Sequence, residues 1–497
     1  MAMLKNLILN QPLKQTKPTI AIIGGGVAGS TIALRFAELG LKTTLMEKGP
    51  SLVNGPPICH LHAGGNLYRE ISDEQCLKLL KQSIDTVKVY PHSVNVRPTI
   101  IALPKTDKGS PDDLRPRLDK LQRSYAALVN KDPANKVLGE PDEYFKFYSR
   151  EEVNTLIGKP IPKKASKPND WLVSFANHTN LDNVQFPILL VQEYGLSAFR
   201  FAAIAMMAID NLPNCELQTH TQVKSIDEHA SAGWTVTTKH KNAPTKEQHF
   251  DYVINACGFR SGEIDDMISA KRQRLVEFKA AYVAHWPKCE GLWPEIIFHG
   301  ERGTPQGMAQ LTPYPDGYFQ LHGMTNDITL FDNGLVESSD NSAQPQLESA
   351  FIEKIDKQWP QQVINKRTER SIEHLAQFIP DFASAKVASQ PMFGAQQIPG
   401  QDPDLRAADV SFDKKHYARA EIVKASSALS ASDAILANLA DSGLLGDTDI
   451  TSLLQTHYFP MSQSFSEESV TEYAIELAQQ RNYSTSLAKT FKGVVNG

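Results

Sequence analysis

Residues 19–48 read TIAIIGGGVAGSTIALRFAELGLKTTLMEK, and this stretch decides the fold. The apolar run 19–25 is typical of a strand that is covered on both faces of a parallel sheet. Apolar side chains from Val27 to Leu39 follow helical spacing, and Gly40 favours a helix end. Residues 41–47 then predict a second strand. The order predicts an α/β domain with a central parallel sheet.

Three glycines between the first strand and the helix, Gly24, Gly26 and Gly29, form GxGxxG in the context that this motif needs. The first allows a tight turn, the second lets backbone approach a pyrophosphate, and the third lets helix and strand pack closely. N–H groups at the helix start then face the phosphate charge. A Rossmann-like dinucleotide site follows, with predicted contacts Gly24, Gly25, Gly26, Val27, Ala28 and Gly29.

An acidic residue ends the second strand, as ribose binding requires. Glu47 stands eighteen residues after Gly29, and Lys48 follows it. A carboxylate there accepts hydrogen bonds from both ribose hydroxyls and disfavours a 2′-phosphate. The alternative is a glycine-rich turn that binds nothing, but the combination of strand, helix and acidic residue favours a dinucleotide.

Two later segments favour FAD over NAD. The segment DYVINACGFRSG (251–262) ends its strand with Ala256 and Gly258, whose small size lets the turn lie against the dinucleotide. The segment QVKSID (222–227) places Val223 beside the adenine. The alternative at this point is an NAD-dependent dehydrogenase, which would be colourless when purified.

Residues 19–48 and 251–262 together resemble the D-amino-acid oxidase-like superfamily of flavoproteins, with weaker similarity to its malate:quinone oxidoreductases. The resemblance implies a Rossmann-like FAD-binding domain and an α+β substrate domain built on an antiparallel sheet. It covers the nucleotide-binding half of the chain, and the substrate half carries little of it.

The loop CHLHAGGNLYRE (59–70) occupies the place where this superfamily runs toward the isoalloxazine ring. Its segment His62, Ala63, Gly64 and Gly65 resembles that of glycerol-3-phosphate and dimethylglycine dehydrogenases. The resemblance implies that His62 lies at the flavin edge, as a hydrogen-bonding partner or a covalent attachment point. An exposed loop histidine is the alternative; His60 is a competing position, and Arg69 is a further candidate for cofactor or substrate.

The C-terminal segment IVKASSALSASDAILANLAD (422–441) corresponds to the turn and helix that close the flavin site in the superfamily. It has serine and alanine where glycine is usual. Ser426, Ser427 and Ser430 are expected to cap the helix and supply N–H donors to the flavin. A capped helix without cofactor contact is the alternative.

Substrate-binding residues have weaker signals. The superfamily often has a carboxylate-binding arginine near 390–400, where this chain has Gln396 and Gln397. Other cations are available, each with a surface ion pair as the alternative: Arg260, Arg302, Arg367 and Arg370. His322 in the strand-like FQLHGMT is the candidate catalytic base together with His62, and a hydrogen-bonded core histidine is the alternative. His285 and His299 are also available.

Composition excludes several classes of protein. The net charge is −5, from 51 basic and 56 acidic residues, so no electrostatic footprint for nucleic acid is present. Five cysteines form no CxxC pair, which argues against a disulfide framework or a zinc site and favours a reducing, cytoplasmic setting. No apolar run approaches the length of a transmembrane helix, which leaves peripheral membrane contact open. No metal is expected.

The segments divide into five predicted parts. Residues 1–100 and 193–270 form the FAD-binding domain, 101–192 and 271–400 the substrate region, and 401–497 the flavin-closing helix and tail. A helix near 346–358 and strand-like sequence to about 398 are expected in the second substrate part.

Besides the NAD-dependent dehydrogenase, two function classes remain open. The leading one is an FAD-dependent oxidoreductase that oxidises a small hydroxy- or amino-acid-like substrate by hydride transfer to flavin N5, with quinone or oxygen as acceptor. The alternative is a flavoprotein that acts on or assembles a partner protein. The absent arginine and the atypical last turn motivate the alternative.

Overall fold

The computed structural model of the protein describes residues 17–54, 61–63, 69, 71–230, 232–408, 410–446, 448–455 and 459–491, with the backbone alone for residues 61–63 and 455.

The first of two large sheets contains the quoted N-terminal stretch. Its order is β21-β22-β13-β1-β2-β9. Its strands are β1 (Thr19–Ile23), β2 (Lys42–Met46), β9 (Cys215–Gln218), β13 (Tyr252–Asn255), β21 (Val410–Ser411) and β22 (Tyr417–Ala420). All neighbours from β22 to β9 pair in parallel, and β21 pairs antiparallel with β22. The expected parallel sheet is confirmed.

Both faces of this sheet are covered, which explains the continuous apolar run of β1. Ile20 and Ile22 pack with the helices α1 (Val27–Glu38), α6 (Ala198–Asp210) and α10 (Ala428–Asp441). Ala21 and Ile23 point to the other face. There they meet α7 (Ser261–Met267) and a three-stranded sheet of β10 (Thr221–Glu228), β11 (Trp234–His240) and β12 (Thr245–Phe250).

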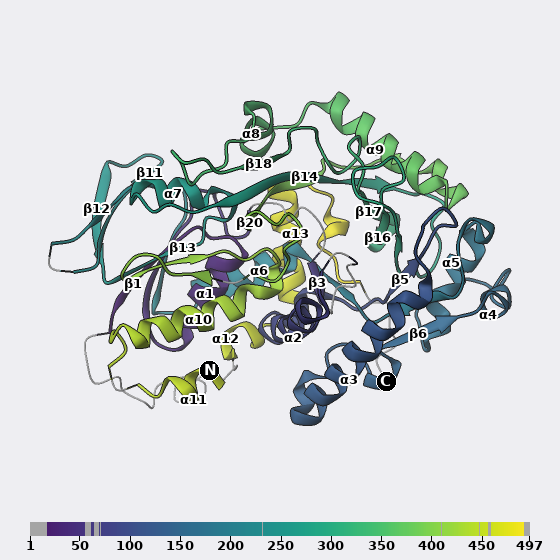
Figure 1. Ribbon diagram of the computed structural model, residues 1–497, viewed down its shortest axis with the longest axis horizontal. Coiled ribbons are helices and arrows are strands. Elements are labelled where there is room, and N and C mark those ends of the chain that lie inside the picture. Colours follow the sequence, from purple (N-terminus) through teal and green to yellow (C-terminus); the bar gives the residue numbers. More distant parts are fainter. Residues whose placement is uncertain are drawn as a thin grey trace.

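The second large sheet has the order β18-β14-β17-β16-β15-β5-β7-β6, with β19 and β20 also paired to β14. Its strands are β5 (Thr99–Ala102), β6 (Phe145–Tyr148), β7 (Ile188–Val191), β14 (Arg274–His285), β15 (Glu295–Phe298), β16 (Ala309–Pro313), β17 (Tyr318–Gly323), β18 (Leu335–Glu337), β19 (Lys386–Val387) and β20 (Met392–Pro399). All pairs are antiparallel except β5 with β15. In Figure 1, β14 runs along the upper part of the view, from the side of β13 to the side of β17.

Helices and a small sheet complete the fold. The small sheet has the order β3-β8-β4, from β3 (Leu61–Ala63), β8 (Tyr194–Leu196) and β4 (Val94–Asn95). The other helices are α2 (Asp73–Val89), α3 (Arg115–Lys131), α4 (Arg150–Asn154), α5 (Leu172–His178), α8 (Ser349–Asp356), α9 (Gln361–Ala376), α11 (Ile450–Gln455), α12 (Pro460–Gln463) and α13 (Glu467–Gln480). Among the described residues, no helix combines the length and apolarity needed to cross a membrane.

One secondary-structure expectation is wrong. Strand-like sequence was expected from residue 358 to about 398, but α9 occupies much of it. Three of its six buried positions are apolar and three are polar: Ile364, Ile372, Leu375, Thr368, Ser371 and His374. These polar residues and the charged residues between them obscured the helical period of the apolar positions in the sequence.

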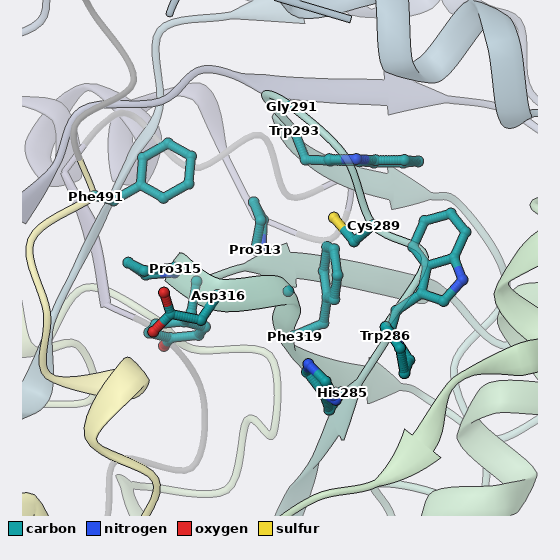
Figure 2. A pocket seen from close by; sticks show the side chains of 13 residues that line it. His285, Trp286, Cys289, Gly291, Trp293, Pro313, Pro315, Asp316, Phe319 and Phe491 are labelled. Atoms are coloured by element: carbon teal, nitrogen blue, oxygen red, sulfur yellow. The ribbon is translucent and has the colours of Figure 1, made fainter. Parts of the chain in front are cut away.

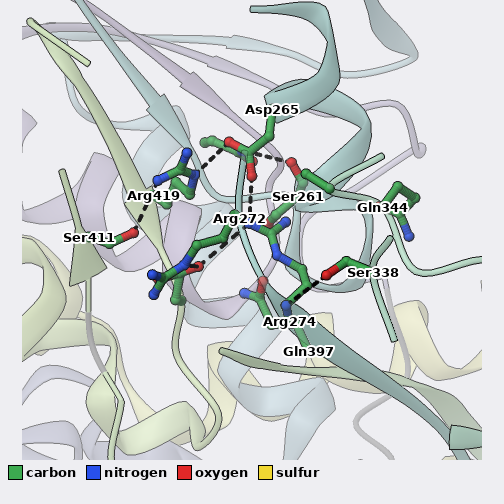
Figure 3. Close-up of polar contacts among 12 residues, drawn as sticks. Ser261, Asp265, Arg272, Arg274, Ser338, Gln344, Gln397, Ser411 and Arg419 are labelled. Carbon is green, nitrogen blue, oxygen red and sulfur yellow. Dashed lines mark hydrogen bonds and ion pairs between the residues drawn. The ribbon is translucent and has the colours of Figure 1, made fainter. Parts of the chain in front are cut away.

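A buried ion network joins the two large sheets (Figure 3). Asp265 of α7 accepts hydrogen bonds from Arg274 of β14, Arg419 of β22 (2.6 Å) and the Tyr417 hydroxyl (2.8 Å). The side chains of Asp265, Arg274 and Arg419 are fully buried. Glu421 extends the network to Arg274 at 3.5 Å. Charges of both signs therefore pair where α7, β14 and β22 meet.

Glu38, at the end of α1, makes stability depend on pH. Burial raises its pKa to about 7, although Met461 N–H donates to its carboxylate at 2.8 Å. The unfolded chain releases this proton near the ordinary value of 4.5, and the folded chain near 7. Because the unfolded chain holds fewer protons between these values, the stability that the group contributes is full below about pH 4.5 and is lost as pH rises to about 7.

We expect Glu38→Gln, which cannot ionise, to be more stable than the unchanged protein above pH 7, by about 3 kcal/mol. The difference in free energy of unfolding should shrink steadily from pH 7 to pH 5. Urea unfolding at several pH values measures it. A difference that does not change with pH would contradict the assignment.

Candidate active site

The glycine turn after β1 is both tightly packed and open on one side. Gly24 has φ +98°, and a Cβ there would lie 2.6 Å from the carbonyl oxygen of Ala256. A Cβ on Gly29 would lie 1.8 Å from the Gly24 carbonyl oxygen. At Gly26, in contrast, a Cβ would meet nothing within 4 Å. Backbone thus lies exposed to open space at the start of α1, where a pyrophosphate fits.

Glu47 is held at this turn with acceptor capacity left over. One carboxylate oxygen accepts from the N–H of Gly25 at 2.7 Å, and the other accepts from the N–H of Gly49 at 2.6 Å. An ionised carboxylate has about four acceptor positions, so two remain for hydroxyl groups. Lys48 is half exposed and lies 3.7 Å from Asp356.

Arg481 braces the turn from the far end of the chain, and no sequence pattern indicated it. It donates to the carbonyls of Leu52 and Val53, each at 2.9 Å, and to the Ser51 hydroxyl at 3.0 Å. Val53 N–H in turn donates to the carbonyl of Gly25 at 2.8 Å. The loop after Glu47 is therefore fixed beside the glycine turn.

The later cofactor candidates lie around the same sheet. Ala256 follows β13 and packs against Gly24, and Gly258 has φ +58° with open space at its Cβ position. Val223 on β10 is buried against Ile23 and Met46. Their contact with a dinucleotide stays a prediction.

The loop expected to reach the flavin is only partly described. The backbone of His62 and Ala63 lies in β3, where His62 is paired with Gly195 of β8. Gly64 and Gly65, like His60, lie outside the described residues. The short helical turn η11 (Ala425–Ser427) is close to β3 and to α1. Segments 61–63 and 425–427 thus meet beside the helix that follows the glycine turn.

The expected capping by serine is wrong. No side chain caps α10. Ser427 instead donates its hydroxyl hydrogen to the Gln82 side chain at 2.8 Å, and the Ser426 carbonyl accepts from Thr86 at 3.3 Å. Ser430 also bonds to Gln82. The serines face α2 because the polar side of that helix packs on them, so their hydroxyls are not available at the helix end.

The second large sheet presents one buried polar face, which the sequence reading missed. In an antiparallel sheet, directly paired residues point to the same side. The pairs Glu277↔Gln396, Gln310↔His322 and Thr312↔Gln320 therefore share a face with Lys279 and Glu295. We call this set the polar sheet face: Glu277, Lys279, Glu295, Gln310, Thr312, Gln320, His322 and Gln396.

The opposite face of these strands is apolar, with Phe278, Leu311 and Leu321 packed in the cores under α5, α8 and α9. A sheet that is covered on both sides normally has apolar residues on both. The polar sheet face has polar residues that are at most 7% exposed, apart from Gln396. Buried polar groups of this kind require an explanation in function or in specific pairing.

Charges gather at one end of the polar sheet face. Glu277 pairs with Lys279 at 2.8 Å and with Arg302. Burial raises the pKa of Glu277, but the charges of Lys279 and Arg302 outweigh burial and hold the pKa below its ordinary value. Lys279 also donates to the Gln396 side chain at 3.0 Å, and Gln396 donates to the Val423 carbonyl at 2.7 Å. The cluster therefore reaches the segment that leads into η11.

The other arginine candidates have structural partners. Arg260 pairs with Glu263 and Asp356 at 2.8 Å each, and Arg370 pairs with Glu373 at 2.9 Å. Arg367 donates to three backbone carbonyls. Among the four candidates, only Arg302 reaches the polar sheet face. Arg69 is exposed and pairs with Asp107 at 2.9 Å.

Three histidines have distinct surroundings. His322 is buried on the polar sheet face. Burial lowers the pKa of His299 to about 3, with a smaller effect from the charge of Arg69, so His299 is neutral at physiological pH. The ring of His285 lies 4.9 Å from that of Tyr318, at the far end of β14.

This arrangement of sheets is shared with solved flavoproteins. Glycine oxidase from Geobacillus kaustophilus matches 89% of this chain and 100% of its own, with TM-score 0.52 and 13% identity. The chain shares the fold of this oxidase. L-amino acid deaminase from Proteus vulgaris matches 90% of this chain and 98% of its own, with TM-score 0.52 and 13% identity. A glycerol-3-phosphate dehydrogenase from Bacillus halodurans, complexed with FAD, matches 89% of this chain and 68% of its own, with TM-score 0.51 and 13% identity.

No protein-family model matches the sequence. The fold expected from the resemblance, a Rossmann-like domain with a second antiparallel sheet, is nevertheless confirmed by these structures and by the strand pairings.

Proposed function

We propose that this protein is an FAD-dependent oxidoreductase that oxidises a small hydroxy- or amino-acid-like substrate. The observation that carries the proposal is the open space over Gly26, at a turn whose other glycines are sterically required. Glu47 adds a carboxylate with unused acceptor positions beside that space. The turn and the acidic residue together fit an adenine dinucleotide.

The substrate-binding part of the proposal rests on the polar sheet face. Its pairing places His322, Gln310 and Lys279 on one buried surface of the second sheet. When bound, flavin supplies a hydride acceptor. On this proposal His322 takes the proton of the substrate's hydroxyl or amino group, amide side chains orient it, and burial excludes water. His62 at the flavin edge remains part of the proposal through its backbone position in β3.

The test is the visible spectrum of the purified protein and its change under anaerobic conditions. We expect flavin absorption bands that bleach when a hydroxy or amino acid from a panel of short acids is added. Acid precipitation reports on covalent attachment, because a flavin bound to His62 stays in the pellet. A colourless protein that takes up no flavin would reject the proposal.

Reoxidation distinguishes the finer alternatives. Peroxide formed during turnover in air identifies oxygen as acceptor, and turnover that requires an added quinone identifies a dehydrogenase. Flavin that no small acid reduces would favour the alternative in which the protein acts on a partner protein.

A further inference from the structure

Arg97 occupies the space between the small sheet and the polar sheet face. Its guanidinium lies against the backbone of Gly195, where a Cβ would come within 2.3 Å of Nη1. Gly195 is the residue paired with His62 in β3. On its other side Arg97 forms an ion pair with Glu295 at 3.1 Å. The guanidinium therefore sits between β8, which pairs with β3, and Glu295 of the polar sheet face.

The bonding of Arg97 is incomplete although its side chain is fully buried. None of its three guanidinium nitrogens has a hydrogen-bond partner among the residues that the structure describes, since the contact to Glu295 is an ion pair without hydrogen-bond geometry. A guanidinium has five N–H donors and a shape that matches a carboxylate. A buried cation with unused donors costs free energy unless a ligand completes it.

Glu295 is itself anchored. Its carboxylate accepts a hydrogen bond from the Gln310 side chain, and Gln310 is paired with His322 across β16 and β17. Arg97, Glu295 and Gln310 thus form a chain of side chains that leads to His322. A group bound at Arg97 would lie on the same buried face as the proposed base.

A cavity of about 290 Å³ is lined in part by residues of β14, β16 and β17 (Figure 2). Phe491 and Tyr314 also line it. The Arg97 Cζ lies 6.0 Å from the centroid of the Phe491 ring, so Phe491 is near both the cavity and the guanidinium. The Tyr314 hydroxyl donates to Gln320 of the polar sheet face at 3.4 Å. Figure 2 shows Phe491 on the side of the cavity opposite Trp286.

We propose that Arg97, held by Glu295, binds the carboxylate of the substrate. The inference rests on the proposed function and deepens it, because it assigns an anchor for acidic substrates in the segment between β4 and β5 instead of at Gln396 of β20. Arg97 has the donors and the burial that a carboxylate requires. Lys279 is the rival cation on the polar sheet face, and it already bonds to Glu277 and Gln396.

The experiment measures carboxylate binding directly, without turnover. Acetate, oxalate and benzoate are titrated against the flavin-loaded protein, each beside its neutral amide, and binding is followed by calorimetry and by the change in the flavin spectrum. The variants are Arg97→Met, Arg97→Lys, the rival Lys279→Met, and Arg123→Met as a control on the exposed surface of α3.

We expect Arg97→Met to weaken carboxylate binding about 10- to 100-fold, from the loss of charged hydrogen bonds, with amide binding unchanged. Arg97→Lys should retain part of the affinity, because lysine keeps the charge but loses the two-pronged geometry. Arg123→Met should bind as the unchanged protein does.

Three results would overturn the inference: equal carboxylate affinity in Arg97→Met, a loss in Lys279→Met alone, or no carboxylate binding by the flavin-loaded unchanged protein. Each is distinct from failure of the proposed function, which appears as absence of flavin. If Arg97→Met does not fold, the lysine variant decides, because unchanged selectivity between benzoate and benzamide in Arg97→Lys also overturns the inference.

Discussion

Replacement of Gly26 by aspartate should leave the protein folded and remove its flavin. Gly26 is the N-cap of α1, with φ −69° and ψ −170°, and no side chain caps that helix. Aspartate is among the best N-cap residues, and a Cβ there meets nothing within 4 Å. The new carboxylate, however, occupies the space proposed for the pyrophosphate and repels its charge. We expect affinity for FAD to fall at least about 1,000-fold, equivalent to about 4 kcal/mol.

The measurement is flavin content after reconstitution with excess FAD, together with thermal unfolding of the flavin-free protein. Gly26→Asn introduces a side chain of nearly the same shape as aspartate but without its charge. The difference in FAD affinity between the two variants therefore separates charge repulsion from steric exclusion. Gly29→Ala is the opposite control, since its Cβ would lie 1.8 Å from the Gly24 carbonyl and should destabilise the fold itself. A Gly26→Asp protein that retains flavin would reject the location of the site.

The contrast between these two glycines shows why this part of the site was predictable. Residues 19–48 form a strand, turn, helix and strand that are consecutive in the chain, so their packing follows from local periodicity and glycine spacing. The steric need for glycine at position 24 involves one contact that is distant in sequence, with the backbone of Ala256 after β13. The acidic residue that completes the unit is also within the same thirty residues.

The polar sheet face was not predictable in the same way. Its residues come from five strands that span positions 277 to 396, and only the register shows that they share a side. One signal was present: in RLVEFKAAYVAH (274–285), Glu277 and Lys279 are two residues apart within an apolar strand, the spacing of one strand face. Arg97 had no such signal, because its burial results from contacts with Gly195 and Glu295 that are distant in sequence.

The C-terminal segment shows a third case, in which composition misled. Ser427 resembles a helix cap by residue type, but a serine can bond to any nearby partner, and here the partner is Gln82 of α2. Arg481 is a contact that no local pattern could indicate, since its bonds to Leu52 and Val53 link positions more than 400 residues apart. In both cases local sequence indicates helix propensity but not which distant segment the side chain will contact.

The largest effect on stability is expected from Asp265→Asn in the ion network of Figure 3. The carboxylate of Asp265 is the shared partner of Arg274 and Arg419, and all three side chains are fully buried. Asparagine keeps the shape but removes the charge, which leaves two buried guanidinium groups against a neutral amide. Loss of one partner from a buried ion pair typically costs 3 to 5 kcal/mol, so we expect the free energy of unfolding to fall by about that amount.

Asp356→Asn is the matched control, because Asp356 also accepts from an arginine, Arg260, and lies near Lys48. Its side chain is 42% exposed, so water replaces the lost interaction and we expect a change below about 1 kcal/mol. Urea unfolding of both variants, compared in the flavin-free state, measures the difference. Since Asp265 joins α7 to β14 and β22, its loss should also separate the unfolding of the two large sheets into distinct steps. Equal losses of free energy of unfolding in the two variants would show that burial does not determine how much the ion network contributes to stability.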